Sequence, residues 1–135
     1  MNLPQRFVLF GSVSAFIAVA AGAFAAHALK TRLAPEHLTA FETAARYQMY
    51  HAFGLFVAAS LTQRGWRLAP PAGWLFLMGT VLFSGSLYLL AVTGISRFGM
   101  ITPVGGLAFL AGWLLLIVCA WPRREQHETA ETGEQ

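Results

Sequence analysis

Two histidines and several tyrosines lie in or beside apolar segments, where such side chains can bind a ligand. His27 ends the first apolar segment, and His51 lies in the run FETAARYQMYHAFGL, residues 41–55. A neutral imidazole can ligate a metal ion or haem iron, and it can equally form hydrogen bonds between helices. Polar side chains are costly in hydrocarbon unless they meet partners, so this run predicts neighbouring helices that supply them.

The run 41–55 predicts a helix with a polar stripe on one face, which we expect to point toward other helices. The stripe comprises Thr39, Thr43, Arg46, Tyr47, Tyr50, His51 and Gly54. Tyr47 and Val92 mark where two of these helices meet the same membrane face. His51 and Tyr88 each lie four residues further into the membrane, so each is about 6 Å below that face. We therefore predict a shallow polar layer near that face. It comprises His27, Tyr47, Gln48, Tyr50, His51, Ser84 and Tyr88, with Arg46 and Arg97 at its rim.

Three interpretations of this polar layer compete. In the first, which we prefer, the side chains form hydrogen bonds with one another and fix the packing of the helices. In the second, the layer is a pocket for a lipid head group, a quinone or another small amphiphile. In the third, His27 and His51 ligate haem or a metal, but no HExxH, CxxCH or carboxylate–histidine cluster accompanies them. We accordingly predict no metal and no cofactor.

The charged residues argue against catalysis and against nucleic-acid binding. Acidic residues occur around the first loop and in the C-terminal tail, so a nucleophile in the apolar segments would lack a base or orienting group. The net charge of +3 is spread along the chain without a dense basic run. The single cysteine, Cys119, excludes an intrachain disulfide and a cysteine metal motif. We predict no catalytic residue, no enzyme activity and no nucleic-acid partner.

The composition indicates an integral membrane protein. Of 135 residues, 56% are hydrophobic and 11% are charged, against roughly 25% charged in soluble domains, and the mean hydropathy is +0.56. Apolar segments of bilayer-spanning length predict four transmembrane helices, at residues 7–26, 35–61, 72–92 and 103–121. The first is longer than a signal-peptide core, so we expect it to be retained as a membrane helix.

These elements predict an all-α fold, an integral membrane four-helix bundle formed by residues 1–122. The second helix is expected to be extended by an amphipathic N-terminal part at the interface, and residues 123–135 to form a mobile acidic tail. Small residues predict close helix contacts, because helices in lipid associate through van der Waals packing. They are Ser14, Ala18, Gly22 and Ala26 on the first helix and Gly105, Gly106 and Gly112 on the last. Thr102 is predicted to cap the last helix.

Four spans place both termini and the middle loop on one side of the membrane. That side carries Arg6, Arg64, Arg67, Arg123 and Arg124, against Lys30, Arg32, Arg46 and Arg97 on the other. The positive-inside rule therefore slightly favours cytoplasmic termini. The side of the termini also carries Trp66, Trp74 and Trp121, which are typical of an interfacial aromatic belt.

Four motifs, in chain order, resemble the signature blocks of the domain-of-unknown-function 423 family. They are GAFAAHAL (22–29), FETAARYQMYHAFGL (41–55), FSGSLYLL (83–90) and ITPVGGLAFLAGW (101–113). The resemblance covers all four expected helices. It implies a small multi-helix protein of the bacterial inner membrane, similar to the eukaryotic transmembrane protein 256, and it implies no activity and no catalytic residue.

We therefore expect a multi-pass membrane protein that is structural or accessory rather than enzymatic. Its expected partners are membrane lipids, further copies of itself or the other members of a larger membrane complex. The alternative is a ligand-binding membrane protein that uses the polar layer around His51 for a lipid head group or quinone, or for haem or a metal.

Overall fold

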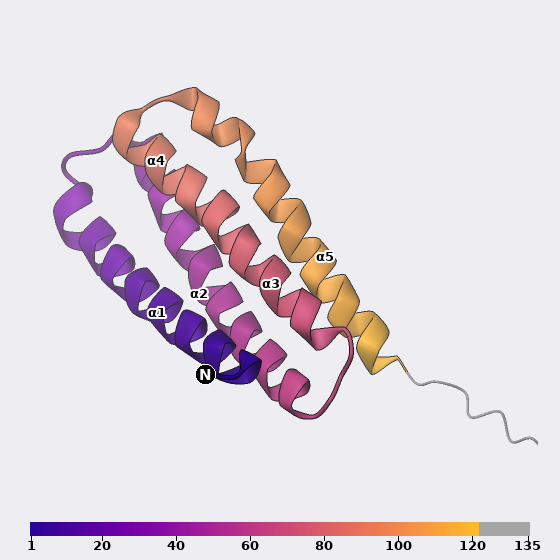
Figure 1. Ribbon diagram of the computed structural model, residues 1–135. Coiled ribbons are helices and arrows are strands. Elements are labelled where there is room, and N and C mark those ends of the chain that lie inside the picture. The colour runs from indigo at the N-terminus through magenta and orange to yellow at the C-terminus, as the bar shows by residue number, and fades with distance from the viewer. Residues whose placement is uncertain (122–135) are drawn as a thin grey trace, which may run out of the picture.

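The structure, a computed structural model, describes residues 1–121, so the predicted tail at 123–135 lies outside the described residues. Within residues 1–121 the chain contains helices and no strand, and it forms four long helical segments joined by short connections (Figure 1). The all-α fold predicted from the sequence is confirmed.

Every segment except the second contains a change of helix type. The first is α1 (Leu3–Phe24) followed by the π-helical turn η1 (Ala25–Leu29), and the second is α2 (Pro35–Gln63). The third consists of α3 (Ala69–Gly79), the π-helical turn η2 (Thr80–Ser84) and α4 (Gly85–Thr93). The last consists of the 3₁₀-helical turn η3 (Ser96–Met100) and α5 (Thr102–Ala120). A π-helical turn changes which of the following side chains face a neighbouring helix.

Prolines and one capping box define where the helices begin. A proline occupies the first turn of α1, α2, α3 and α5, where its missing N–H has no intrahelical partner to lose. At α1 the side chains of Asn2 and Gln5 each accept a hydrogen bond from the other's backbone N–H at 3.0 Å. The predicted start of the third helix at residue 72 is wrong. α3 begins at Ala69, so Pro70 and Pro71 belong to its first turn rather than to the connection.

The predicted cap of the last helix is also wrong. Thr102 is the first residue of α5, and the cap position is held by Ile101, which has no side-chain cap bond. The turn η3 leads almost directly into α5. Because the Thr102 hydroxyl does not cap the helix, it can form a hydrogen bond with the Ser86 hydroxyl of α4, and the two oxygens lie 2.8 Å apart. The hydroxyl therefore joins two helices instead of capping one.

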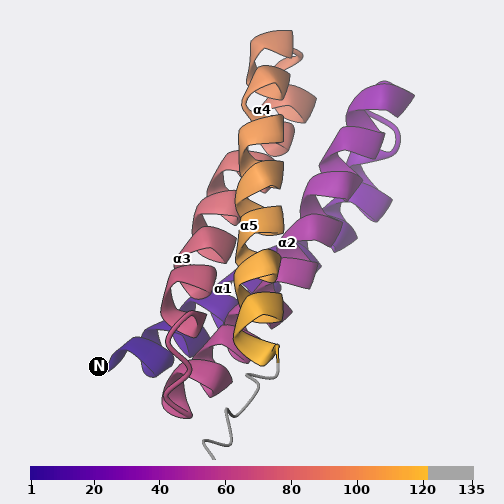
Figure 2. The same ribbon diagram turned by 90° about the vertical axis from the view of Figure 1, so that its right-hand side faces the viewer.

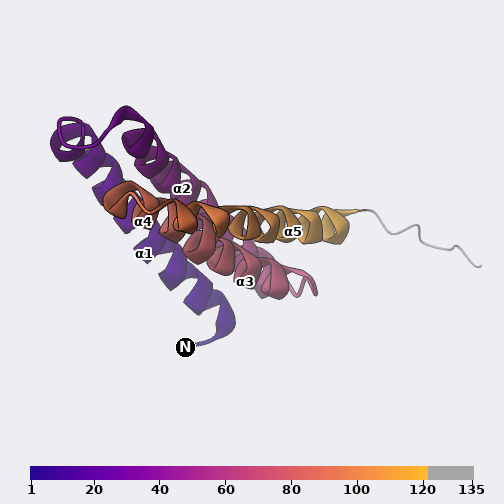
Figure 3. The same cartoon turned by 90° about the horizontal axis from the view of Figure 1, so that it is seen from above.

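α2 lies at the centre of the arrangement. It packs against α1 and against α3 and α4, while α5 packs against α3 and η2. Figure 2 shows α1 and α2 inclined to the other helices, so that the two groups diverge toward the α1–α2 connection. The view from above in Figure 3 shows the same inclination. α1 is therefore attached to the rest of the protein mainly through α2.

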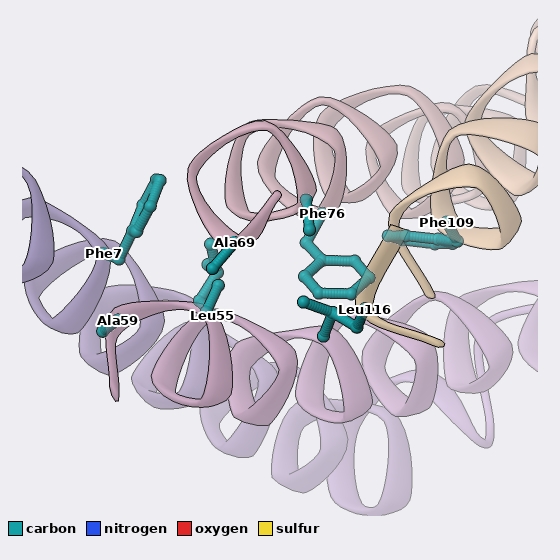
Figure 4. Packing of buried hydrophobic residues seen from close by; sticks show 9 residues of the cluster. Phe7, Leu55, Ala59, Ala69, Phe76, Phe109 and Leu116 are labelled. Carbon is teal, nitrogen blue, oxygen red and sulfur yellow. The ribbon is translucent and has the colours of Figure 1, made fainter. Parts of the chain in front are cut away.

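The core consists of aromatic rings packed onto small residues of neighbouring helices. Phe76 of α3 lies beside Leu116 of α5 (Figure 4) and against Gly112, where an added Cβ would be 2.6 Å from the ring. Phe7 of α1 covers Gly73 of α3 in the same manner. Such contacts bring helix backbones close together, which is how helices gain van der Waals energy in lipid.

α1 contacts α2 through a set of small residues that only partly matches the predicted one. Gly11 lies against the α2 backbone, and Ser14 and Ala18 are buried. Gly22 has no atom within 4 Å of an added Cβ, and Ala26 is exposed. A step of four residues turns a helix by about 40° beyond one full turn, so a strict series of such steps rotates off the contact face. The contact on α1 therefore ends before the predicted series does.

On α5, two of the three predicted glycines lie in tight contact with the third segment. Gly105 and Gly112 are buried, Gly105 against the backbone of Phe83 and Gly112 against the Phe76 ring. Gly106 has more room, because the nearest atom to an added Cβ is 3.8 Å away. The two buried glycines set how closely α5 approaches its neighbour.

Three of the four segments are long and apolar enough to cross a membrane. They are Leu3–Leu29, Ala69–Thr93 and Ser96–Ala120. Large apolar side chains project outward from them, including Phe16 of α1 at 75% exposure and Leu110 of α5 at 67%. Exposed apolar faces of this extent are unfavourable in water and favourable in hydrocarbon. α2 carries more polar and charged residues and is not among the three.

Candidate functional site

α2 is packed on more than one side, and of the polar residues in the predicted stripe only His51 is buried. Gln48 and His51 are 6% and 5% exposed, whereas Tyr47 and Tyr50 are 40% and 56% exposed. Arg46 is exposed as well. The reason is that α1 covers one side of α2 while α3 and α4 cover another, so no single polar face points inward. The predicted inward orientation is therefore wrong for the exposed members of the stripe, which are Thr39, Arg46, Tyr47 and Tyr50.

Two hydrogen bonds and a ring stack hold His51 in place. Its Nδ1 lies 2.8 Å from the carbonyl oxygen of Tyr47, and its Nε2 lies 3.2 Å from the indole Nε1 of Trp113. Its ring is parallel to that of Phe109, with centroids 3.3 Å apart and an interplanar angle of 6°. Trp113 and Phe109 both belong to α5, so these contacts attach the middle of α2 to α5.

The partners of His51 determine its tautomer. An indole N–H can only donate and a carbonyl oxygen can only accept, so Nε2 accepts from Trp113 and Nδ1–H donates to Tyr47. The imidazole is therefore neutral, and its one available lone pair, on Nε2, already accepts the hydrogen bond from Trp113. Within residues 1–121, moreover, no group of three or more His, Cys, Asp or Glu side chains is placed to hold a metal ion. In this arrangement the ring of His51 links helices and has no lone pair left for a metal.

A second polar pair joins α2 to α4. Tyr88 Oη donates to Gln48 Oε1 at 2.8 Å, and the Tyr88 ring meets Phe41 edge-on with centroids 4.8 Å apart. Residues 48 and 88 are distant in sequence, and the polar layer had placed both of them at one depth. The structure brings these two members of the layer into direct contact.

Removing the Tyr88 hydroxyl tests this pair. Tyr88→Phe should lower the free energy of unfolding by about 1 to 2 kcal/mol, because the Gln48 oxygen stays buried without its donor. Tyr50→Phe is the matched control, since the Tyr50 ring is mostly exposed, and it should change stability by less than about 0.5 kcal/mol. Unfolding in mixed detergent and SDS micelles, followed by tryptophan fluorescence, measures both variants. Equal losses would show that the bond adds no stability.

Thr80, Ser84 and Tyr88 follow one another at intervals of four residues, but their hydroxyl groups lie in different surroundings. Thr80 Oγ1 donates to the carbonyl oxygen of Phe76 at 2.9 Å, and Tyr88 bonds to α2. The Ser84 hydroxyl is buried and has no hydrogen-bond partner among the described residues. The π-helical turn η2 covers the first two of these residues and changes the helical phase there, so a spacing of four no longer keeps them on one stripe.

The other members of the predicted layer lie toward the surface. Tyr47 stacks on a phenylalanine of η2 with ring centroids 4.7 Å apart, and Tyr50 lies beside Tyr47 at 5.8 Å. His27, on η1, is exposed and makes no side-chain hydrogen bond or ring contact within residues 1–121. The rim residue Arg97 is exposed on η3, and Arg46 lines a groove of about 380 Å³ between α1 and α2. Of this outer group, Tyr47 alone contacts the interior pairs, since its carbonyl oxygen and its ring both lie beside His51.

Sequence reasoning missed the aromatic partners of His51. Trp113 and Phe109 lie one turn apart in an apolar segment, where positions that face lipid and positions that face protein have the same residue types. Trp113 does carry one signal that could have found it. Its indole N–H lies in the middle of an apolar segment and requires an acceptor.

Comparisons with known proteins identify relatives along most of the chain. The family model described as a protein of unknown function (DUF423) matches residues 21–106. The UPF0382 membrane protein YwdK of Bacillus subtilis (strain 168) is 47% identical over 116 residues, which cover 84% of this chain and 94% of the relative. The UPF0382 membrane protein SH2409 of Staphylococcus haemolyticus (strain JCSC1435) is 44% identical over 114 residues, which cover 84% and 93%.

A third relative comes from a different bacterium. The UPF0382 inner membrane protein YgdD of Escherichia coli (strain K12) is 42% identical over 122 residues, which cover 87% of this chain and 92% of the relative. No solved structure matches the chain. The names of these relatives describe membrane proteins, in agreement with the three apolar segments. The resemblance seen in the sequence motifs is confirmed: the chain belongs to the DUF423 family and is a small multi-pass membrane protein.

Proposed function

We propose that this protein is a non-enzymatic structural or accessory component of the bacterial inner membrane. It acts by packing with lipids and with partner membrane proteins or further copies of itself. One observation carries the proposal: the buried polar side chains of α2 bond to the protein's own helices. His51 accepts from Trp113, and Gln48 accepts from Tyr88. Polar groups used in this way hold helices together and leave little for binding a small ligand.

We also propose that α2 crosses the membrane, which makes the fold a four-helix transmembrane bundle. α2 packs along α1 and along the third segment, both of which are long and apolar enough to span. Its polar residues Gln48 and His51 are covered and bonded, which removes most of the cost of placing them in hydrocarbon. Glu36 and Glu42 lie in its N-terminal part, which suits an amphipathic extension at the interface.

Four spans put both termini and the α2–α3 connection on one side of the membrane. Arg6, Arg64 and Arg67 lie at that end of the described chain. Over the whole sequence that side carries five basic residues against four on the other, and positive residues are retained on the cytoplasmic side during insertion, so we propose cytoplasmic termini. The description of the Escherichia coli relative as an inner membrane protein supports the choice of membrane.

The outer surface supports association within the membrane. α1 exposes Phe16 and Val19 at 75% and 62%, and α5 exposes Leu107 and Leu114 at 66% and 58%. α1 and α5 pack against different neighbours, so each leaves an apolar face uncovered by this chain. Such faces meet acyl chains or the helices of another membrane protein, where close packing supplies the attraction.

The association is tested on the full chain extracted into native nanodiscs with a styrene–maleic acid copolymer. Native mass spectrometry should show masses above the 14.7 kDa monomer, as oligomers or as complexes with a defined protein or lipid. A bare monomer that retains neither protein nor lipid contradicts the proposal. An absorbance spectrum of the same sample covers the alternative, because a haem band or a stoichiometric quinone would indicate a ligand-binding protein.

The fourth span is tested by labelling single cysteines from one side of the membrane. Thr31→Cys and Gln63→Cys, each in a Cys119→Ser background, mark the two ends of α2. An impermeant thiol reagent applied to sealed vesicles should label only one of the two variants. If it labels both equally, and lysed vesicles give no increase, α2 does not cross the membrane.

A further inference from the structure

A groove of about 650 Å³ lies between the α2–α3 connection and the last turns of α5. It is separate from the polar pairs around His51. On one side its walls are Trp66, Arg67 and Leu68, and on the other Ile117, Val118 and Trp121. The groove therefore combines one cationic side chain, two indole rings and an apolar wall.

Within residues 1–121, the charged side chains at this end of the molecule are all positive. Arg6, Arg64 and Arg67 lie at this end of the molecule, at the start of α1 and in the α2–α3 connection. Among residues 1–121 the acidic side chains are Glu36 and Glu42, and both lie near the start of α2, at the opposite end. Arg67 is exposed at the groove, so its guanidinium is open to an anion.

The depth of the groove matches the boundary between head groups and acyl chains. α2 ends and α3 begins beside it, and α5 ends at Ala120. Trp66 and Trp121 lie at this level, where indole rings are favoured because one part of the ring is apolar and the N–H can reach water or phosphate. Ile117 lies four residues before Trp121, so it is about 6 Å deeper, within the hydrocarbon.

We infer that this groove holds an anionic phospholipid. The phosphate lies at Arg67, the glycerol and ester region lies between Trp66 and Trp121, and one acyl chain follows Ile117 and Val118. Guanidinium groups bind phosphate with charge-assisted hydrogen bonds, and basic residues next to a membrane select anionic lipids. A zwitterionic lipid has the same phosphate, but its own cation opposes the positive end of the protein. The inference rests on the proposed membrane crossing of α2 and is independent of the proposed protein partners.

The test compares two lipids of identical acyl chains on the full protein. Wild-type protein in detergent is titrated with palmitoyl-oleoyl phosphatidylglycerol or phosphatidylcholine, and native mass spectrometry counts the lipids retained. Wild type should retain the anionic lipid preferentially. Arg67→Gln should lower that preference about fivefold, the effect expected for one basic residue near an anionic lipid. Arg6→Gln is the matched control, because it removes the same charge from the same end without lining the groove.

Three outcomes overturn the inference. Equal retention of both lipids by wild type would show that the groove does not select an anionic lipid. The same result is expected if another part of the chain fills the groove. Equal losses in Arg67→Gln and Arg6→Gln would indicate attraction to the whole positive end and not a site. A preference that survives Arg67→Gln unchanged, with helicity by circular dichroism equal to wild type, would place the lipid elsewhere. The oligomeric masses in the same spectra report on the proposed association separately.

Discussion

Replacing Gly105 by alanine should destabilise the protein by about 3 kcal/mol, the upper end of the usual cost of overpacking. An added Cβ would collide with the backbone nitrogen of Phe83 and lie 2.8 Å from its Cα. A side chain could rotate away, but the backbone of η2 can move only if α5 and the third segment separate. Unfolding in mixed detergent and SDS micelles, followed by tryptophan fluorescence, measures the loss.

The neighbouring glycine supplies the control for this prediction. At Gly106 the nearest atom to an added Cβ is 3.8 Å away, which is an ordinary contact. Gly106→Ala should therefore leave stability unchanged or raise it by up to about 1 kcal/mol, because alanine is the better helix former. If the two variants unfolded at the same SDS concentration, the close approach of α5 to Phe83 would not be a determinant of the fold.

Replacing His51 by alanine should lower the free energy of unfolding by about 3 kcal/mol. The change leaves the Trp113 N–H without its acceptor in an apolar segment, at a cost of about 1 to 3 kcal/mol, and removes a ring stack worth about 0.5 to 1.5 kcal/mol. His51→Phe keeps a ring against Phe109 while removing both hydrogen bonds, so its loss should be smaller. The same SDS titration ranks the variants.

His27→Ala is the control for the histidine series. His27 is exposed and should change stability by less than about 0.5 kcal/mol when replaced. Near-infrared and Soret absorbance of each purified variant provides a second measurement. Unchanged stability in His51→Ala together with the loss of a bound chromophore would contradict the packing role of His51 and support a ligand site.

The helices could be predicted from the sequence because their determinants are local. Apolar runs of bilayer length and a proline in each first turn define where the segments lie, and the observed boundaries differ by a few residues. The identity of the buried polar residues was partly predictable for a similar reason. Gln48, His51 and Tyr88 had to find partners in an apolar setting, and the first and last of these bond to each other.

The rest of the site depends on contacts that leave no local signal. Trp113 is one of several large residues in an apolar segment, and only the crossing of α2 and α5 makes it the partner of His51. The polar stripe that contains Tyr50 resembles an inward-facing surface when α2 is taken alone, but two neighbours cover α2 from different sides and leave Tyr50 exposed. The π-helical turn at Ser84 also leaves no hydropathy pattern, so the sequence could not show that Thr80, Ser84 and Tyr88 face different neighbours.

The pairing of helices has a consequence for how the protein is made. Each major contact joins segments that follow one another in the chain: the first with the second, the second with the third, and the third with the last. During synthesis from the N-terminus, every segment that leaves the ribosome therefore finds its partner already inserted. Gln48 therefore gains its partner as soon as the third segment is inserted, whereas His51 waits until the last segment brings Trp113.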